Sequence, residues 1–142
     1  MEQAVADLFA RYEHLFAESL ADPARAGDME PLYTSDVLAA SQQGVVAGKT
    51  RDFLGALAQG FERYRAQGLR QMRVSSLRIV PIDEGHCLAH VGWNARYERD
   101  DLPSTTISFE VHYLVQLRQG EARVFAWIAG DEEAALREHG VT

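Results

Sequence analysis

The first half of the chain repeats apolar residues at helical spacing. From Val5 to Leu20 they recur every three or four positions, as they do on one face of a helix. A second such stretch runs from Thr50, the expected N-cap, to Gly68, the expected stop. Between them, after the breaker-rich "ADPARAGD", Asp28 is placed to cap a short helix over "MEPLYTS". The pattern therefore predicts three N-terminal helices.

From position 71 onward the helical period gives way to alternation of apolar and polar residues, which is typical of strands with one buried face. Turns at "DEG", "RDDLP" and "RQGE" divide this region into expected strands near 72–82, 86–98, 104–117 and 123–130. The closing "DEEAALREHG" is acidic at its start and ends in a glycine, as a short helix does. We expect one α+β domain over residues 1–142, with the helices packed on a curved, mainly antiparallel sheet of four or more strands.

Strand parity predicts which side chains share a sheet face. If the "RDDLP" turn pairs Glu98 with Ser104, and the next turn is centred on Gly120, one face is almost wholly apolar and should take the helices. Four aromatic residues lie on that face: Trp93, Phe109, Tyr113 and Trp127. Such rings either line a pocket for a small molecule or fill a core.

The opposite face carries His90, Glu110 and His112, with the two histidines directly across from each other. Two imidazoles and a carboxylate can bind a metal ion, but a strand pair supplies no third ligand from a separate element. We therefore expect neither a metal nor a cofactor. Three apolar residues of the last strand share this face: Val124, Ala126 and Ile128. Apolar surface there favours a homodimer through the outer sheet face.

Composition and charge exclude some classes of partner. The formal net charge of -7 opposes binding to nucleic acid. No apolar run approaches the ~20 residues that span a bilayer, and the N-terminal "MEQAVADLF" is acidic where a secretory signal is basic. We expect a cytoplasmic protein with no nucleic-acid or membrane partner. Cys87, the only cysteine, has no charged neighbour in sequence and is interpreted as a core residue.

The stretch "QGVVAGKT" at positions 43–50 is similar to a phosphate-binding loop, with one difference. Such a loop has four residues between its first glycine and Gly-Lys-Thr, whereas this stretch has three. Gln43 stands where the first glycine would be needed for left-handed backbone angles. We therefore predict no nucleotide binding, and interpret the stretch as an extended piece that leads into the helix at Thr50.

The order of these segments resembles the nuclear transport factor two-like superfamily. The resemblance is carried by "FARYEHLF", "AGDMEPLYTSDV", "GVVAGKTRDFLGAL" and the strand order after them, and it covers nearly the whole chain. It implies a cystatin-like cone fold, shared with steroid isomerases, polyketide cyclases and scytalone dehydratase, and a ligand cavity above the aromatic face. Tyr12 and Tyr33 then complete the candidate ligand-binding set: Tyr12, Tyr33, Trp93, Phe109, Tyr113 and Trp127.

The same resemblance tests one specific chemistry. Tyr12 matches the tyrosine that donates to a developing oxyanion in steroid isomerases. The carboxylate base and the oxyanion-stabilising acid of those enzymes fall near Ser41 and Val111 here, and neither residue is acidic. Proton abstraction therefore lacks its base there, and Asp36 and Asp131 are the nearest candidate carboxylates. Two hypotheses remain: a binder of an apolar small molecule, in some form a cofactor-independent isomerase, cyclase or dehydratase, or a non-catalytic dimerisation or association domain.

Overall fold

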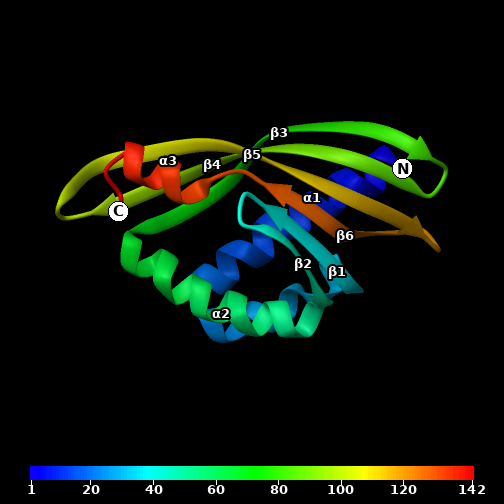
Figure 1. Ribbon diagram of the computed structural model, residues 1–142, viewed down its shortest axis with the longest axis horizontal. Helices are drawn as coiled ribbons and strands as arrows, with labels where there is room; N and C mark the ends of the chain where they lie inside the picture. Colours follow the sequence, from blue (N-terminus) through cyan, green and yellow to red (C-terminus); the bar gives the residue numbers. More distant parts are fainter.

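Helices lie against one face of a curved six-stranded sheet in the computed structural model, which describes residues 1–142 (Figure 1). The helical elements are α1 (Glu2–Ala21), the 3-10 helix η1 (Pro23–Leu32), α2 (Thr50–Gln67) and a short C-terminal α3 (Glu132–Glu138). The predicted α+β fold, with three helical elements before the main strands and one after them, is thus confirmed.

Local capping differs from the prediction in two places. The side chain of Asp22, not Asp28, caps η1 by accepting from the amide of Ala24 at 3.2 Å. Thr50 is the first residue of α2 rather than its cap, and its hydroxyl donates to the carbonyl of Thr34 on the neighbouring strand. Gly68 ends α2 in the left-handed region, with φ of 101°, as predicted.

The sheet has two more strands than the sequence pattern indicated. Its strands are β1 (Tyr33–Ser41), β2 (Gly44–Lys49), β3 (Leu69–Asp83), β4 (His86–Arg99), β5 (Leu102–Arg118) and β6 (Glu121–Ala129). They lie in the order β2-β1-β6-β5-β4-β3, with β1 parallel to β6 and all other neighbours antiparallel. The expected short helix over "MEPLYTS" is present only in part: η1 includes "MEPL" but starts earlier, at Pro23, and ends at Leu32, after which the chain is extended.

The stretch that resembles a phosphate-binding loop forms β2, an edge strand of the sheet. Its backbone pairs with β1 from Asp36 to Ser41, and the ammonium group of Lys49 forms an ion pair with the carboxylate of Asp36. Because this backbone is extended and paired, it forms no loop of converging amides.

The predicted registers of the long strands are confirmed. Trp93 pairs with Phe109, His90 with His112, and Tyr113 lies between Ala89 and Trp127. The register shifts beyond Tyr97 and Thr105, so the predicted pairing of Glu98 with Ser104 does not form.

Val124 is on the other face from the one predicted. A β-bulge in β6 lets Val124 pair with Val115 while Ala126 pairs with Leu114, so strict alternation is broken at Phe125. Val124 is consequently 0% exposed in the core, whereas Ile128 stays on the outer face.

The core lies between α1, α2, η1 and the inner face of β4, β5 and β6. Phe16 of α1 packs edge-on against Phe61 of α2, with ring centroids 4.8 Å apart. Glu13 fixes α1 to the sheet, because its carboxylate accepts from the amide of Val74 at 2.9 Å. None of the helices has the length and the apolar run needed to cross a membrane.

Candidate functional site

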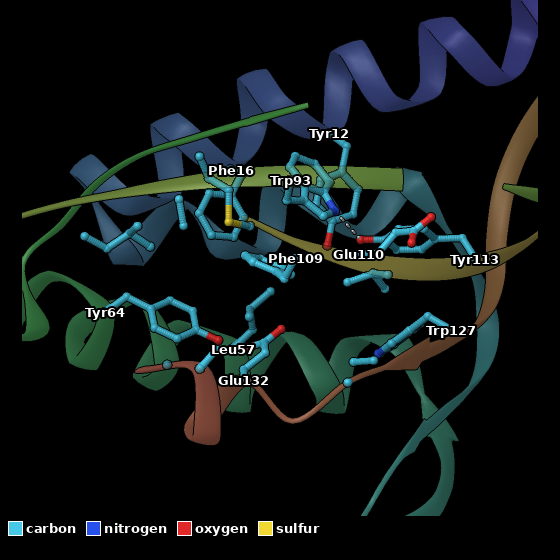
Figure 2. Close-up of a pocket in the computed structure, with 18 of the residues that line it drawn as sticks. Tyr12, Phe16, Leu57, Tyr64, Trp93, Phe109, Glu110, Tyr113, Trp127 and Glu132 are labelled. Carbon is cyan, nitrogen blue, oxygen red and sulfur yellow. Dashed lines mark hydrogen bonds between the residues drawn. The ribbon is translucent and has the colours of Figure 1, made fainter. Parts of the chain in front are cut away.

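A cavity of about 490 Å³ opens between the inner sheet face and α1, α2 and α3. Figure 2 shows side chains from these elements pointing toward one common space. All six predicted ligand-binding residues line it: Tyr12, Tyr33, Trp93, Phe109, Tyr113 and Trp127. Residues of α2 outside that predicted set complete the wall: Leu54, Leu57, Gly60, Arg63 and Tyr64. The lining is thus mainly apolar, with a few polar groups.

Tyr12 lies at the centre of an aromatic cluster that connects α1 to the sheet. Its ring centroid is 5.4 Å from that of Trp93, 6.0 Å from that of Tyr113 and 6.2 Å from that of Tyr33. Tyr33 in turn lies 5.6 Å from Trp127, again between ring centroids. These tilted and edge-on contacts hold the rings in fixed positions, so one wall of the cavity is preformed.

The hydroxyl groups of this cluster form a buried hydrogen-bonded chain. The hydroxyl of Tyr33 donates to that of Tyr12 at 3.1 Å, and the indole N–H of Trp93 donates to the hydroxyl of Tyr113 at 3.2 Å. Burial raises the pKa of Tyr12, and hydrogen bonds with Tyr33 and Tyr113 offset part of that rise. All of these groups are therefore protonated at neutral pH. Because the oxygen of Tyr12 accepts from Tyr33, its own proton remains available for a ligand.

Glu132, at the start of α3, faces these hydroxyls across the cavity (Figure 2). Although the residue as a whole is exposed at the mouth, its carboxyl group lies among lining side chains, where desolvation raises its pKa. Burial and then the charge of Glu132 raise the pKa of Tyr64 to about 12, and the same two causes raise that of Tyr97 to about 12. The negative charge of Glu132 therefore affects the ionisation of side chains that line the cavity.

Neither carboxylate favoured from the sequence occupies that position. Asp36 is exposed on β1, where it pairs with Lys49. Asp131 borders the cavity, but its carboxylate caps α3 by accepting from the amide of Ala134 at 2.9 Å. Glu132 is next to Asp131 in sequence, yet only the fold of α3 over the cavity mouth reveals which of the two is directed inward.

The three polar residues of the outer face also come together. The Nδ1 atoms of His90 and His112 are 2.6 Å apart, and the carboxylate of Glu110 lies beside them. Burial, then Arg78 and His112, lower the pKa of His90 below its ordinary value. This cluster lies on the opposite side of β4 and β5 from the aromatic rings.

Comparison with known proteins gives one family and many solved structures. A family model described as an NTF2-like protein (DUF6841) matches residues 2–132. No curated protein matches the sequence.

The solved structures agree on the fold and differ in their described roles. An NTF2-like protein with a cystatin-like fold from Novosphingobium aromaticivorans is 16% identical, with 96% of this chain and 86% of that chain covered and a TM-score of 0.70. A candidate scytalone dehydratase from the same organism is 13% identical, with 89% and 80% covered and a TM-score of 0.65. A candidate calcium/calmodulin dependent protein kinase II association domain from Xanthomonas campestris is 12% identical, with 89% and 84% covered and a TM-score of 0.61. At these identities the likeness shows the cone fold alone.

Proposed function

The chain belongs to the NTF2-like protein family DUF6841, and on that premise we propose that it binds a small apolar molecule with a carbonyl or hydroxyl group in its cavity. The observation that carries the proposal is that one fixed hydrogen-bond donor lies in a mainly apolar cavity. The hydroxyl of Tyr12 is held in place by Tyr33, inside a cavity of about 490 Å³ lined mainly by apolar side chains. Pockets of this size and lining take drug-sized ligands.

Affinity comes from the rings and orientation from Tyr12. Each 100 Å² of apolar ligand surface that leaves water contributes about 2.5 kcal/mol before the costs of binding. A ligand oxygen that accepts from Tyr12 adds about 1 kcal/mol, the usual net value of one neutral hydrogen bond. The ligand that fits best is therefore a flat or aliphatic ketone, enone or alcohol.

The position of Glu132 extends this binding site to proton-transfer chemistry. For an enolisable ketone held by Tyr12, the carboxylate of Glu132 takes a proton from the carbon beside the carbonyl. The electron pair of that C–H bond moves to the carbonyl oxygen, whose negative charge accepts a hydrogen bond from Tyr12. Return of the proton to the same carbon gives exchange only. In a ketone with a C=C bond one carbon further along, the enolate is a dienolate: Glu132 returns the proton to its far carbon, the C=C bond shifts into conjugation and the carbonyl reforms, which completes an isomerisation in which no cofactor takes part. A carboxylate with a raised pKa is suited to this task because it exchanges protons closer to neutral pH.

The test is a fluorescence titration of a panel of lipophilic ketones, with Trp93 and Trp127 as intrinsic reporters. We expect saturable quenching or a spectral shift, with a roughly fivefold weaker Kd for Tyr12→Phe. Proton exchange at the carbon beside the carbonyl, followed by NMR in D₂O, should be lost in Glu132→Gln and kept in the control Asp36→Asn. No fluorescence response from any ketone would remove the binding proposal. Binding with no exchange above the solvent rate would remove the chemistry and leave a binder.

A second candidate function, self-association, is favoured by an apolar patch on the outer sheet face. The backbone register places Leu38, Val45 and Ile128 on that face of β1, β2 and β6, where they are 41%, 64% and 52% exposed. Exposed apolar residues in adjacent rows are typical of an interface. A second copy of the chain, packed face to face on this patch, would cover them.

Sedimentation tests this second proposal. We expect a dimer at micromolar concentration that Ile128→Lys dissociates. The control is Val46→Lys, because Val46 is equally apolar and 59% exposed but pairs with Ala39 on the other side of the same strands. A monomeric wild-type protein, or an equal effect of both variants, would contradict an interface at this patch.

A further inference from the structure

We propose that His90, Glu110 and His112 form a binding site for a divalent transition-metal ion such as Zn²⁺, on the sheet face turned away from the cavity. The proposal does not depend on any ligand in the cavity. It assigns a role to His90 and His112, which line neither the core nor the cavity, and to Glu110, which borders the cavity but has its carboxylate beside the two imidazoles.

The strand register brings the three ligands together. His90 of β4 and His112 of β5 are directly paired, so their side chains leave the sheet side by side. Glu110 lies two residues before His112 and therefore on the same face. One ligand atom from each residue lies within 4.8 Å of the other two. From the sequence we expected no metal because a strand pair offers no ligand from a separate element, but here the pair itself supplies the third ligand.

The two imidazoles already have their coordinating atoms directed at each other. Their Nδ1 atoms are 2.6 Å apart, a distance at which one proton must lie between them, with one ring donating and the other accepting. A metal ion takes the place of that proton. With Zn–N bonds of about 2.0–2.1 Å and tetrahedral angles, the nitrogens sit about 3.3 Å apart. Both histidines are partly exposed, so a small rotation of either side chain provides this opening.

Charge and donor type select the class of ion. Two neutral imidazoles with one carboxylate suit Zn²⁺ and its first-row neighbours, whereas Ca²⁺ and Mg²⁺ prefer oxygen ligands only. Arg78, on the adjacent strand β3, lies directly across from His90 in the sheet. Its positive charge opposes the binding of a cation, and the negative charge of Glu110 offsets that effect. Three protein ligands leave one position on the ion open toward solvent, as in sites that bind water or a further ligand.

The experiment uses tag-free, chelator-treated protein. ZnCl₂ is titrated by calorimetry with MgCl₂ as the comparison, and Co²⁺ is titrated while its visible d–d absorption is recorded. We expect one Zn²⁺ per chain, no response to Mg²⁺, and an absorption typical of four-coordinate Co²⁺. His90→Gln, His112→Gln and Glu110→Gln should each weaken Zn²⁺ binding at least roughly tenfold. The matched control is His14→Gln, an exposed histidine beside Glu18 on α1, which should bind Zn²⁺ like the wild type.

Each contrary result identifies a different error. Absence of Zn²⁺ heat and of the Co²⁺ band, or equal weakening by the control, overturns the site. Half an ion per chain together with dimer formation means that two copies share the ion, which overturns the three-ligand site within one chain. Glu110 is exposed, so Glu110→Gln leaves the fold intact, and unchanged binding by that variant overturns the role of the carboxylate.

Discussion

The hydrogen bond between Tyr33 and Tyr12 can be measured by a double-mutant cycle. The hydroxyl of Tyr33 donates to that of Tyr12 at 3.1 Å, and Tyr33 is only 7% exposed. Tyr12→Phe removes the acceptor and leaves a buried donor without its partner. Tyr33→Phe removes the donor, but the hydroxyl of Tyr12 keeps its hydrogen bond with Tyr113. Both substitutions delete this bond, and Tyr12→Phe in addition deletes the bond between Tyr12 and Tyr113.

The expected magnitudes follow from that asymmetry. An unpaired buried hydroxyl costs about 1–3 kcal/mol, whereas loss of a bond whose remaining group keeps another partner costs about 0.5–1.5 kcal/mol. Tyr12→Phe should therefore lower the free energy of unfolding more than Tyr33→Phe. The double variant should cost less than the sum of the two, with a coupling energy of about 1 kcal/mol.

Equilibrium unfolding in urea, followed by far-ultraviolet circular dichroism, measures all four proteins. The slope of the unfolding free energy with urea should be the same for all, which shows that only stability has changed. A coupling energy below about 0.3 kcal/mol would mean that the two hydroxyls do not bond in solution. A larger loss for Tyr33→Phe than for Tyr12→Phe would refute the assignment of Tyr33 as the donor.

Four further predictions concern the cavity wall, the end of α2 and the edge strand. Burial raises the pKa of Glu132, so its ionised form destabilises the folded state; Glu132→Gln should raise the Tm at pH 7 by differential scanning fluorimetry, and the gain should vanish as pH falls below the ordinary carboxyl pKa of about 4.3. An equal gain at every pH would contradict this. Trp93 is 1% exposed, so Trp93→Ala should lower the free energy of unfolding, measured in urea, by about 3–5 kcal/mol. A loss below about 1 kcal/mol would mean that neighbouring side chains collapse into the void. Gly68→Ala should lower stability by more than about 1 kcal/mol in the same assay, because φ is +101° and the added Cβ would lie 2.9 Å from the carbonyl oxygen of Glu98; an unchanged midpoint would argue against this backbone geometry. Calorimetry should detect no ATP or GTP binding at residues 43–50, and micromolar binding that Lys49→Ala abolishes would overturn that expectation.

The long-range features that could be predicted are those governed by regular periodicity. Alternation over ten or more residues fixed the pairing of Trp93 with Phe109 and of His90 with His112, because a slip of one residue would turn every buried side chain outward. The same reasoning brought Trp93, Phe109, Tyr113 and Trp127 to one sheet face, whereas the cavity above that face was implied by the resemblance to the superfamily. These inferences needed no knowledge of how the helices dock.

The features that the sequence did not predict lie where the local pattern of apolar and polar residues is interrupted. The segment after Leu32 mixes short polar and small residues, so "YTSDVLAAS" gave no clear alternation, and β1 forms because it has neighbours on both sides. The bulge at Phe125 moved Val124 from the outer face to the core, and a single inserted residue leaves no mark on the pattern. Glu132 was missed because its role depends on where α3 lies, which is a tertiary property.

The parallel pairing of β1 with β6 constrains the order in which the strands of the sheet can pair during folding. β1 is made early in synthesis, whereas its parallel partner β6 begins only at Glu121. All of α2, β3, β4 and β5 is therefore synthesised before β6 can pair with β1. Contacts between residues so far apart in sequence slow folding, since the entropy of closing the long loop is lost before the contact stabilises the chain. Until then β1 and β5 each present an unpaired edge, which is where a nascent chain is most prone to aggregate. The rings of Tyr33 on β1 and Trp127 on β6 are in contact across this pairing, so this part of the cavity wall can form only once the two strands have joined.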